Sequence, residues 1–122
     1  MASKTVLVVE DGLEESFLLD HQLRGAGFET VVVASGEAAL EELASCPPDA
    51  VILDLNLPGI DGWETLGRLR DRPTGRDVPV ILLTGRDGGI ARRRGRGDRI
   101  AAFVSKPWTT AGLLRDLRIA LA

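Results

Sequence analysis

Short apolar runs recur along the chain, separated by longer segments in which polar and apolar residues mix. Most of these runs are continuous rather than alternating, and they are rich in valine, isoleucine and leucine. Continuous runs of this length are typical of strands that are covered on both faces, as in a parallel sheet. We therefore predict five strands, over Thr5–Val9, Thr30–Val33, Ala50–Leu53, Val78–Leu83 and Ala101–Val104.

The segments between the predicted strands contain residues that begin and end helices. The first helix is predicted from about Leu13 to Arg24, ahead of the glycines at 25 and 27, which favour a helix end. Residues with short polar side chains stand where the later helices should start, and such side chains cap helix N-termini. The predicted caps are Ser35, Asp61 and either Thr109 or Thr110.

The fourth predicted helix is weaker than the others. Residues 88–97 contain four glycines and a cluster of arginines. Each glycine costs roughly 1 kcal/mol relative to alanine in a helix interior, and neighbouring like charges repel. We expect this helix to be short, frayed or partly unwound.

Strands therefore alternate with helices five times. This order predicts parallel βαβ units with right-handed crossovers, and hence an α/β fold. The chain has 122 residues, 44% hydrophobic and 27% charged, which suits one globular domain over residues 1–122. No apolar run is long enough to span a membrane, and no secretory signal is recognisable. The single cysteine, Cys46, fits a reducing compartment, so we expect a cytoplasmic location.

The net charge of −3 conceals an asymmetry along the chain. Residues 1–64 contain 13 acidic and 2 basic side chains, whereas residues 65–122 contain 5 acidic and 13 basic ones. Such a division indicates either an interaction surface or two solvated faces of one compact fold.

The polar residues at the ends of the predicted strands carry the chemistry. Ligands of an open α/β sheet bind outside the carboxyl ends of its strands. Glu10 and Asp11 follow the first strand, Asp54 the third, Thr84 the fourth and Lys106 the fifth. We therefore expect three carboxylates, one hydroxyl and one ammonium group to meet at one edge of the sheet.

This set of groups suits phosphoryl transfer. Crowded carboxylates raise one another's pKa, and an oxygen-preferring dication such as Mg2+ relieves the conflict. An aspartate can act as the nucleophile and form an acyl phosphate, while positive charge and hydrogen-bond donors neutralise the transferred oxygens. Asp54 is the candidate acceptor, with Thr84 and Lys106 as candidate phosphoryl contacts. The backbone carbonyl of Asn56 is a further candidate metal ligand.

Four motifs in this order resemble a known family. They are Val-Val-Glu-Asp at 8–11, Asp-Leu-Asn-Leu-Pro-Gly-Ile-Asp-Gly at 54–62, Leu-Leu-Thr-Gly at 82–85 and Phe-Val-Ser-Lys-Pro-Trp at 103–108. Together they look like the receiver domain of bacterial two-component response regulators, over essentially the whole chain. The resemblance implies a flavodoxin-like (βα)5 three-layer sandwich with a parallel five-stranded sheet in the order 2-1-3-4-5.

The resemblance also implies roles for individual residues. Asp54 would take a phosphoryl group from a phosphohistidine of a sensor histidine kinase or phosphotransfer protein, and Thr84 and Lys106 would contact that group. The chain would then be a signalling phosphoacceptor, limited to its own phosphorylation and dephosphorylation, and the Lys106-Pro107 peptide would be cis. The implied Mg2+ ligands are Glu10, Asp11, Asp54 and the Asn56 carbonyl.

A conformational switch is implied as well. Thr84 would move toward the phosphoryl group, and Phe103 would turn into the space that Thr84 leaves. The partner-binding face would comprise the fourth helix, the fifth strand and the fifth helix. We hypothesise that the arginines of the weak fourth helix, Arg92, Arg93, Arg94 and Arg96, contact an output partner; the alternative is an idle solvated surface.

Other functions remain open at this point. The chain could be a stand-alone regulator, a receiver domain cut from a hybrid sensor kinase or larger regulator, or a degenerate receiver that acts without phosphorylation. A haloacid-dehalogenase-type phosphatase uses similar groups, but it needs an acid two residues after its nucleophile, where this chain has Asn56. Direct nucleic-acid binding is not expected from an acidic chain without aromatic residues among its arginines.

Overall fold

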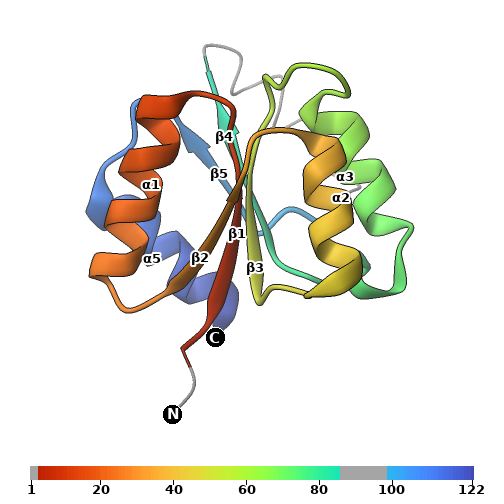
Figure 1. Cartoon of the computed structure of the whole chain (residues 1–122). Coiled ribbons are helices and arrows are strands. Elements are labelled where there is room, and N and C mark those ends of the chain that lie inside the picture. Colours follow the sequence, from red (N-terminus) through yellow and green to blue (C-terminus); the bar gives the residue numbers. More distant parts are fainter. Residues whose placement is uncertain (1–2, 86–98) are drawn as a thin grey trace.

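The computed structural model describes residues 3–85 and 99–122 and contains a five-stranded parallel sheet in the order β2-β1-β3-β4-β5 (Figure 1). Helices cover both faces of the sheet, so the predicted flavodoxin-like sandwich is confirmed. The strands are β1 (Thr5–Val9), β2 (Glu29–Val33), β3 (Ala50–Asp54), β4 (Val80–Thr84) and β5 (Ala102–Ser105). The helices are α1 (Leu13–Gly25), α2 (Gly36–Ser45), α3 (Gly62–Arg70), α5 (Thr110–Leu121) and the 3-10 helix η1 (Pro73–Gly75).

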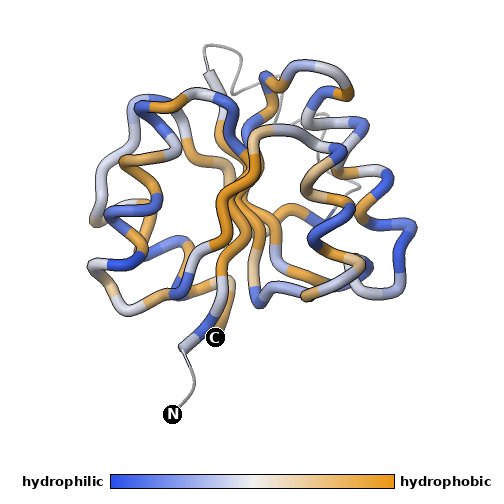
Figure 2. Tube along the Cα trace, viewed as in Figure 1, coloured by the Kyte–Doolittle hydropathy of each residue, from blue (hydrophilic) through white to orange (hydrophobic). Residues whose placement is uncertain are grey.

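Two hydrophobic layers hold the helices to the sheet. On one face, Leu43 of α2 and Leu66 of α3 are buried against alternate residues of the strands. On the other face, Leu19 of α1 and Leu113 of α5 do the same. Figure 2 shows the resulting distribution, with the hydrophobic sheet in the centre and the hydrophilic residues mainly on the outer sides of the helices. Strands buried on both faces explain why their sequences do not alternate.

The helix starts follow the predicted caps. Ser35 Oγ accepts a hydrogen bond from the amide of Ala38 at 3.1 Å, and the Asp61 carboxylate accepts one from the amide of Glu64 at 2.8 Å. Thr109, not Thr110, caps α5, because its hydroxyl accepts from the amide of Gly112 at 3.0 Å. These hydrogen bonds confirm the predicted caps, because a short polar side chain just before a helix accepts a hydrogen bond from an amide of the first turn.

Four strands differ from the prediction by one or two residues at their ends. β2 begins at Glu29 rather than Thr30, and β3 ends at Asp54 rather than Leu53. β4 begins at Val80 rather than Val78, and β5 spans Ala102–Ser105 rather than Ala101–Val104. Pro79 precedes β4, and a proline has no amide hydrogen to contribute to a strand ladder. At the other end of β4, Thr84 pairs with Ser105, which extends both strands toward the site. The predicted fourth helix, with Arg92, Arg93, Arg94 and Arg96, lies outside the described residues.

Candidate functional site

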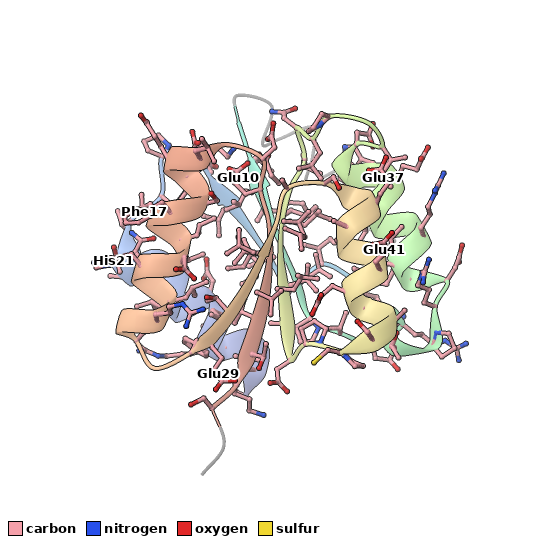
Figure 3. All side chains as sticks on the ribbon, in the orientation of Figure 1. Glu10, Phe17, His21, Glu29, Glu37 and Glu41 are labelled. Carbon is pink, nitrogen blue, oxygen red and sulfur yellow. The ribbon has the colours of Figure 1, made fainter. Side chains whose placement is uncertain are left out.

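The predicted site residues meet at the carboxyl ends of the strands. Glu10 directly follows β1, Asp54 ends β3, Thr84 ends β4 and Lys106 directly follows β5. Because all five strands are parallel, these positions lie at one edge of the sheet. Figure 3 shows Glu10 at this edge and Glu29, the first residue of β2, at the opposite edge.

Lys106 joins two of the carboxylates. Its Nζ atom lies 2.9 Å from Asp54 Oδ2 and 3.2 Å from Glu10 Oε1. Glu10 and Asp54 are each only 2% exposed, whereas the Lys106 side chain is partly exposed. The ammonium group therefore lies between a buried acidic pair and the solvent.

Asp11 completes an acidic cluster. One oxygen each from Glu10, Asp11 and Asp54 lies within 4.8 Å of the others. Unlike its neighbour Glu10, Asp11 is exposed. Three convergent carboxylates, one of them open to water, fit a hard dication such as Mg2+, which binds through a few carboxylates and keeps several waters. Among the described residues, no other three acidic, histidine or cysteine side chains lie close enough together to hold a metal ion.

The two buried carboxyl groups of the cluster have shifted pKa values. Burial and the adjacent Asp54 raise the pKa of Glu10 from its ordinary 4.5 to about 7. Burial acts to raise the pKa of Asp54 too, but hydrogen bonds from Glu10, the Asn56 amide and Lys106 outweigh it and hold that pKa below its ordinary value. A bound dication would favour the ionised form of both carboxyl groups.

The loop after β3 supports Asp54 through its backbone. The Asn56 amide donates a hydrogen bond to Asp54 Oδ1 at 3.0 Å, so both carboxylate oxygens of Asp54 have a donor. Gly62 approaches this loop closely: a β-carbon added there would lie 2.6 Å from Leu55 Cα and 2.7 Å from the Asp54 carbonyl oxygen. Metal binding by the Asn56 carbonyl stays a prediction.

Thr84 has an unusual environment. It is 2% exposed, and its Oγ1 is buried without a hydrogen-bond partner among the described residues. A buried hydroxyl that lacks a partner costs roughly 1–3 kcal/mol, so such groups often serve a function. Successive strand residues point to opposite faces, and Leu82 and Phe103, which pair across β4 and β5, pack in the same core layer. Thr84 is two residues after Leu82 and so shares that face with Phe103.

The segment after Lys106 includes two features of the site. The Lys106-Pro107 peptide is cis, as predicted. The Trp108 indole Nε1 donates a hydrogen bond to Gln22 Oε1 of α1 at 2.8 Å. Sequence reasoning did not single out Gln22, because 86 residues separate it from Trp108 and no local motif links the two.

Comparison with known sequences identifies the family. The sequence model named response regulator receiver domain matches residues 6–118. The chain is 37% identical over 116 residues to the phosphate regulon transcriptional regulatory protein PhoB of Rhizobium meliloti, covering 95% of this chain and 51% of that protein. It is 40% identical over 119 residues to the sensory transduction protein RegX3 of Mycobacterium tuberculosis, covering 96% of this chain and 50% of that protein. The chain thus spans about half the length of these curated relatives.

Solved structures support the same assignment. A putative response regulator from Chloroflexus aurantiacus superimposes with a TM-score of 0.93 at 33% identity, covering 98% of both chains. The receiver domain of a sensor histidine kinase from Pseudomonas aeruginosa, solved with a magnesium ion coordinated in the active site cleft, gives a TM-score of 0.89 at 28% identity, again over 98% of both chains. The acidic cluster of Glu10, Asp11 and Asp54 is typical of the magnesium site of such domains. The fold, the strand-end acidic cluster and these matches together show that the chain belongs to the response regulator receiver domain family.

Proposed function

We propose that Asp54 accepts a phosphoryl group from a phosphohistidine of a sensor histidine kinase or phosphotransfer protein in a Mg2+-dependent reaction. The observation that carries the proposal is the convergence of three carboxylates with Lys106, whose Nζ lies 2.9 Å from Asp54 Oδ2. Glu10, Asp11, Asp54 and the Asn56 carbonyl would hold the ion. When bound, the ion supplies positive charge that offsets the charge of the phosphoryl oxygens.

In the reaction, a carboxylate oxygen of Asp54 attacks phosphorus. The new phosphorus–oxygen bond forms as the phosphorus–nitrogen bond to the donor imidazole breaks, and the nitrogen keeps the electron pair. Lys106 then turns its ammonium group from the carboxylate to a phosphoryl oxygen, and the Thr84 hydroxyl donates to another. The Thr84 hydroxyl, which has no hydrogen-bond partner among the described residues, therefore gains an interaction in the transition state that the resting site lacks, as catalysis requires.

Thr84 also supports the proposed switch. Its hydroxyl gains a partner only when the phosphoryl group is present, so phosphorylation favours the conformation in which Thr84 points toward the site. Phe103, on the same face of the sheet, would fill the space that Thr84 leaves. The result is a population shift that a partner reads at β5, α5 and the segment between β4 and β5. Recognition by Arg92, Arg93, Arg94 and Arg96 remains a prediction outside the described residues.

The outer surface of α1 is the face that we expect the phosphodonor protein to contact. Leu13 is 86% exposed and Phe17 74% exposed, and the Phe17 ring stacks on His21. Figure 3 shows Phe17 and His21 on the outer side of α1, away from the sheet. From the same helix, Leu18 lines a hollow together with Lys106, so this apolar surface continues to the reacting groups.

Phosphorylation by a small donor tests the proposal directly. The protein is incubated with phosphoramidate and Mg2+, and its intact mass is measured. We expect a gain of one phosphoryl group in the native protein and none in Asp54→Asn, which keeps the shape of the acceptor but removes its nucleophilic charge. No gain in the native protein, or an equal gain in the variant, would refute the proposal. Steady release of phosphate from a small phosphomonoester would instead favour the phosphatase alternative.

A further inference from the structure

The side-chain amide of Gln22 binds one short segment at two points. Its Oε1 accepts a hydrogen bond from Trp108 Nε1 at 2.8 Å, and its Nε2 donates one to Thr110 Oγ1 at 2.6 Å. Both partners belong to residues 106–110, the segment that connects Lys106 to the start of α5. A donor and an acceptor used on the same segment fix its orientation as well as its distance from α1.

At its other end, the segment is held by the sheet. The backbone amide of Lys106 donates to the Thr84 carbonyl at 2.8 Å, which continues the pairing of β4 and β5. Lys106 therefore lies between two attachments, the backbone of β4 on one side and Gln22 on the other. Its Nζ must remain within reach of Asp54 for phosphoryl transfer.

Two open hollows border the segment. A hollow of about 380 Å³ lies on one side, lined by Leu18, Lys106, Pro107 and Trp108 among others. A second hollow of about 480 Å³ is lined by Gln22, Thr110 and Leu114 among others. Trp108 packs only partly into the core between α1 and α5. Because two open hollows border the segment, it has fewer packing contacts there than a buried segment would have, and the Gln22 amide supplies a directional restraint.

We propose that Gln22 is a positioning residue for phosphoryl transfer: its paired hydrogen bonds to Trp108 and Thr110 hold the segment that places Lys106 against Asp54. The inference rests on the proposed function, since it concerns the rate at which Asp54 is phosphorylated. Gln22 itself does not touch the reacting atoms and acts through Lys106.

The test uses Gln22→Met, which keeps the length of the side chain and removes both hydrogen bonds. With phosphoramidate and Mg2+, the rate of phosphorylation is followed by intact mass. A misplacement of about 1 Å can cost up to 100-fold in rate, so a partial loosening should slow the reaction about tenfold. Thr30→Val is the matched control, because it removes the hydrogen bond from Thr30 to Asp20, which ties α1 to β2 instead. Its rate should stay within about twofold of the native rate, as expected for a site without shared partners.

A double-mutant cycle separates positioning from a general loss of structure. In the Lys106→Ala background, Gln22→Met should change the rate by less than about twofold, because the group that it positions is gone. Thermal unfolding of each variant verifies that it is folded.

The outcomes distinguish the inference from the proposed function. If the native protein is phosphorylated and Gln22→Met reacts at the native rate, the inference is wrong and the proposed function stands. If Gln22→Met is slowed equally with and without Lys106, or if Thr30→Val is slowed as much, Gln22 acts on the fold in general and the inference is wrong. If the native protein is not phosphorylated, the proposed function itself is refuted.

Discussion

Replacement of Glu10 by glutamine should have opposite effects on stability with and without magnesium. Glu10 is 2% exposed and lies beside Asp54, and its pKa is raised from 4.5 to about 7. Ionisation of Glu10 at pH 8 therefore destabilises the metal-free folded protein. Glutamine has the same shape, cannot ionise and can still accept a hydrogen bond from Lys106, so it avoids this penalty.

The pH window follows from the two pKa values. Between about pH 4.5 and pH 7, the unfolded chain ionises at this position while the folded chain keeps its proton, so stability falls as the pH rises through this range. Each unit of pKa difference corresponds to about 1.4 kcal/mol, which gives an upper bound of about 3 kcal/mol. Local rearrangement and water entry reduce such penalties, so we expect Glu10→Gln to stabilise the metal-free protein by about 1–3 kcal/mol at pH 8 and by little near pH 5.

Magnesium should reverse the order of stability. A ligand that binds only the folded state stabilises it by about 2.7 kcal/mol at 100 times its Kd. Glu10→Gln removes one carboxylate from the cluster, weakens Mg2+ binding and so loses much of this gain. In saturating Mg2+ at pH 8, we expect the native protein to be at least as stable as the variant.

Urea unfolding measures both effects. The free energies of unfolding of the native protein and Glu10→Gln are compared at pH 5, 7 and 8, first with a chelator and then with Mg2+. Glu14→Gln, which removes an exposed carboxylate from the start of α1, is the control and should change stability by no more than about 0.5 kcal/mol. A variant that is less stable than the native protein at pH 8 without metal would refute our account of Glu10. So would a difference that does not depend on pH.

Three further substitutions test other parts of the site. Thr84→Val removes a buried hydroxyl but keeps the shape of the side chain, so the free energy of unfolding should stay the same or rise by about 1 kcal/mol, while phosphorylation slows about tenfold or more. A loss of more than about 2 kcal/mol in urea unfolding would show that the hydroxyl is hydrogen-bonded. Gly62→Ala forces a β-carbon against the backbone of Leu55 and should lower the free energy of unfolding by about 2 kcal/mol or more, whereas Gly67→Ala on the open side of the same helix should be neutral or stabilising. Equal stability of the two variants would contradict the close approach of Gly62 to Leu55. Phe17→Ser should slow phosphoryl transfer from a sensor kinase that phosphorylates the chain but leave phosphorylation by phosphoramidate unchanged. The control is Ile119→Ser, which changes a residue of α5 that is 69% exposed. Equal effects of the two variants on transfer from the kinase would exclude α1 as the docking face.

Features with local causes could be read from the sequence. Ser35 and Asp61 cap helices through bonds that span three residues, so neighbouring residues suffice to predict them, whereas the choice of Thr109 over Thr110 required the structure. The meeting of Asp54 with Lys106 was also predictable, although 52 residues separate them, because parallel strands bring all their carboxyl ends to one edge. The order of the strands required a resemblance to a known family, since periodicity alone does not determine which strands are neighbours.

Other features depended on the tertiary structure. Glu10 and Asp11 are adjacent acids in the sequence, but Asp11 is exposed, whereas Glu10 is buried and burial raises its pKa to about 7. The unpartnered Thr84 hydroxyl and the two hydrogen bonds of Gln22 likewise arise from the way distant segments pack. The sequence by itself determined the elements of the fold and which groups reach the edge of the sheet, because local hydrogen bonding and strand polarity control both. Only the tertiary structure decided how those groups are charged and held, because burial and long-range contacts set pKa values and side-chain positions.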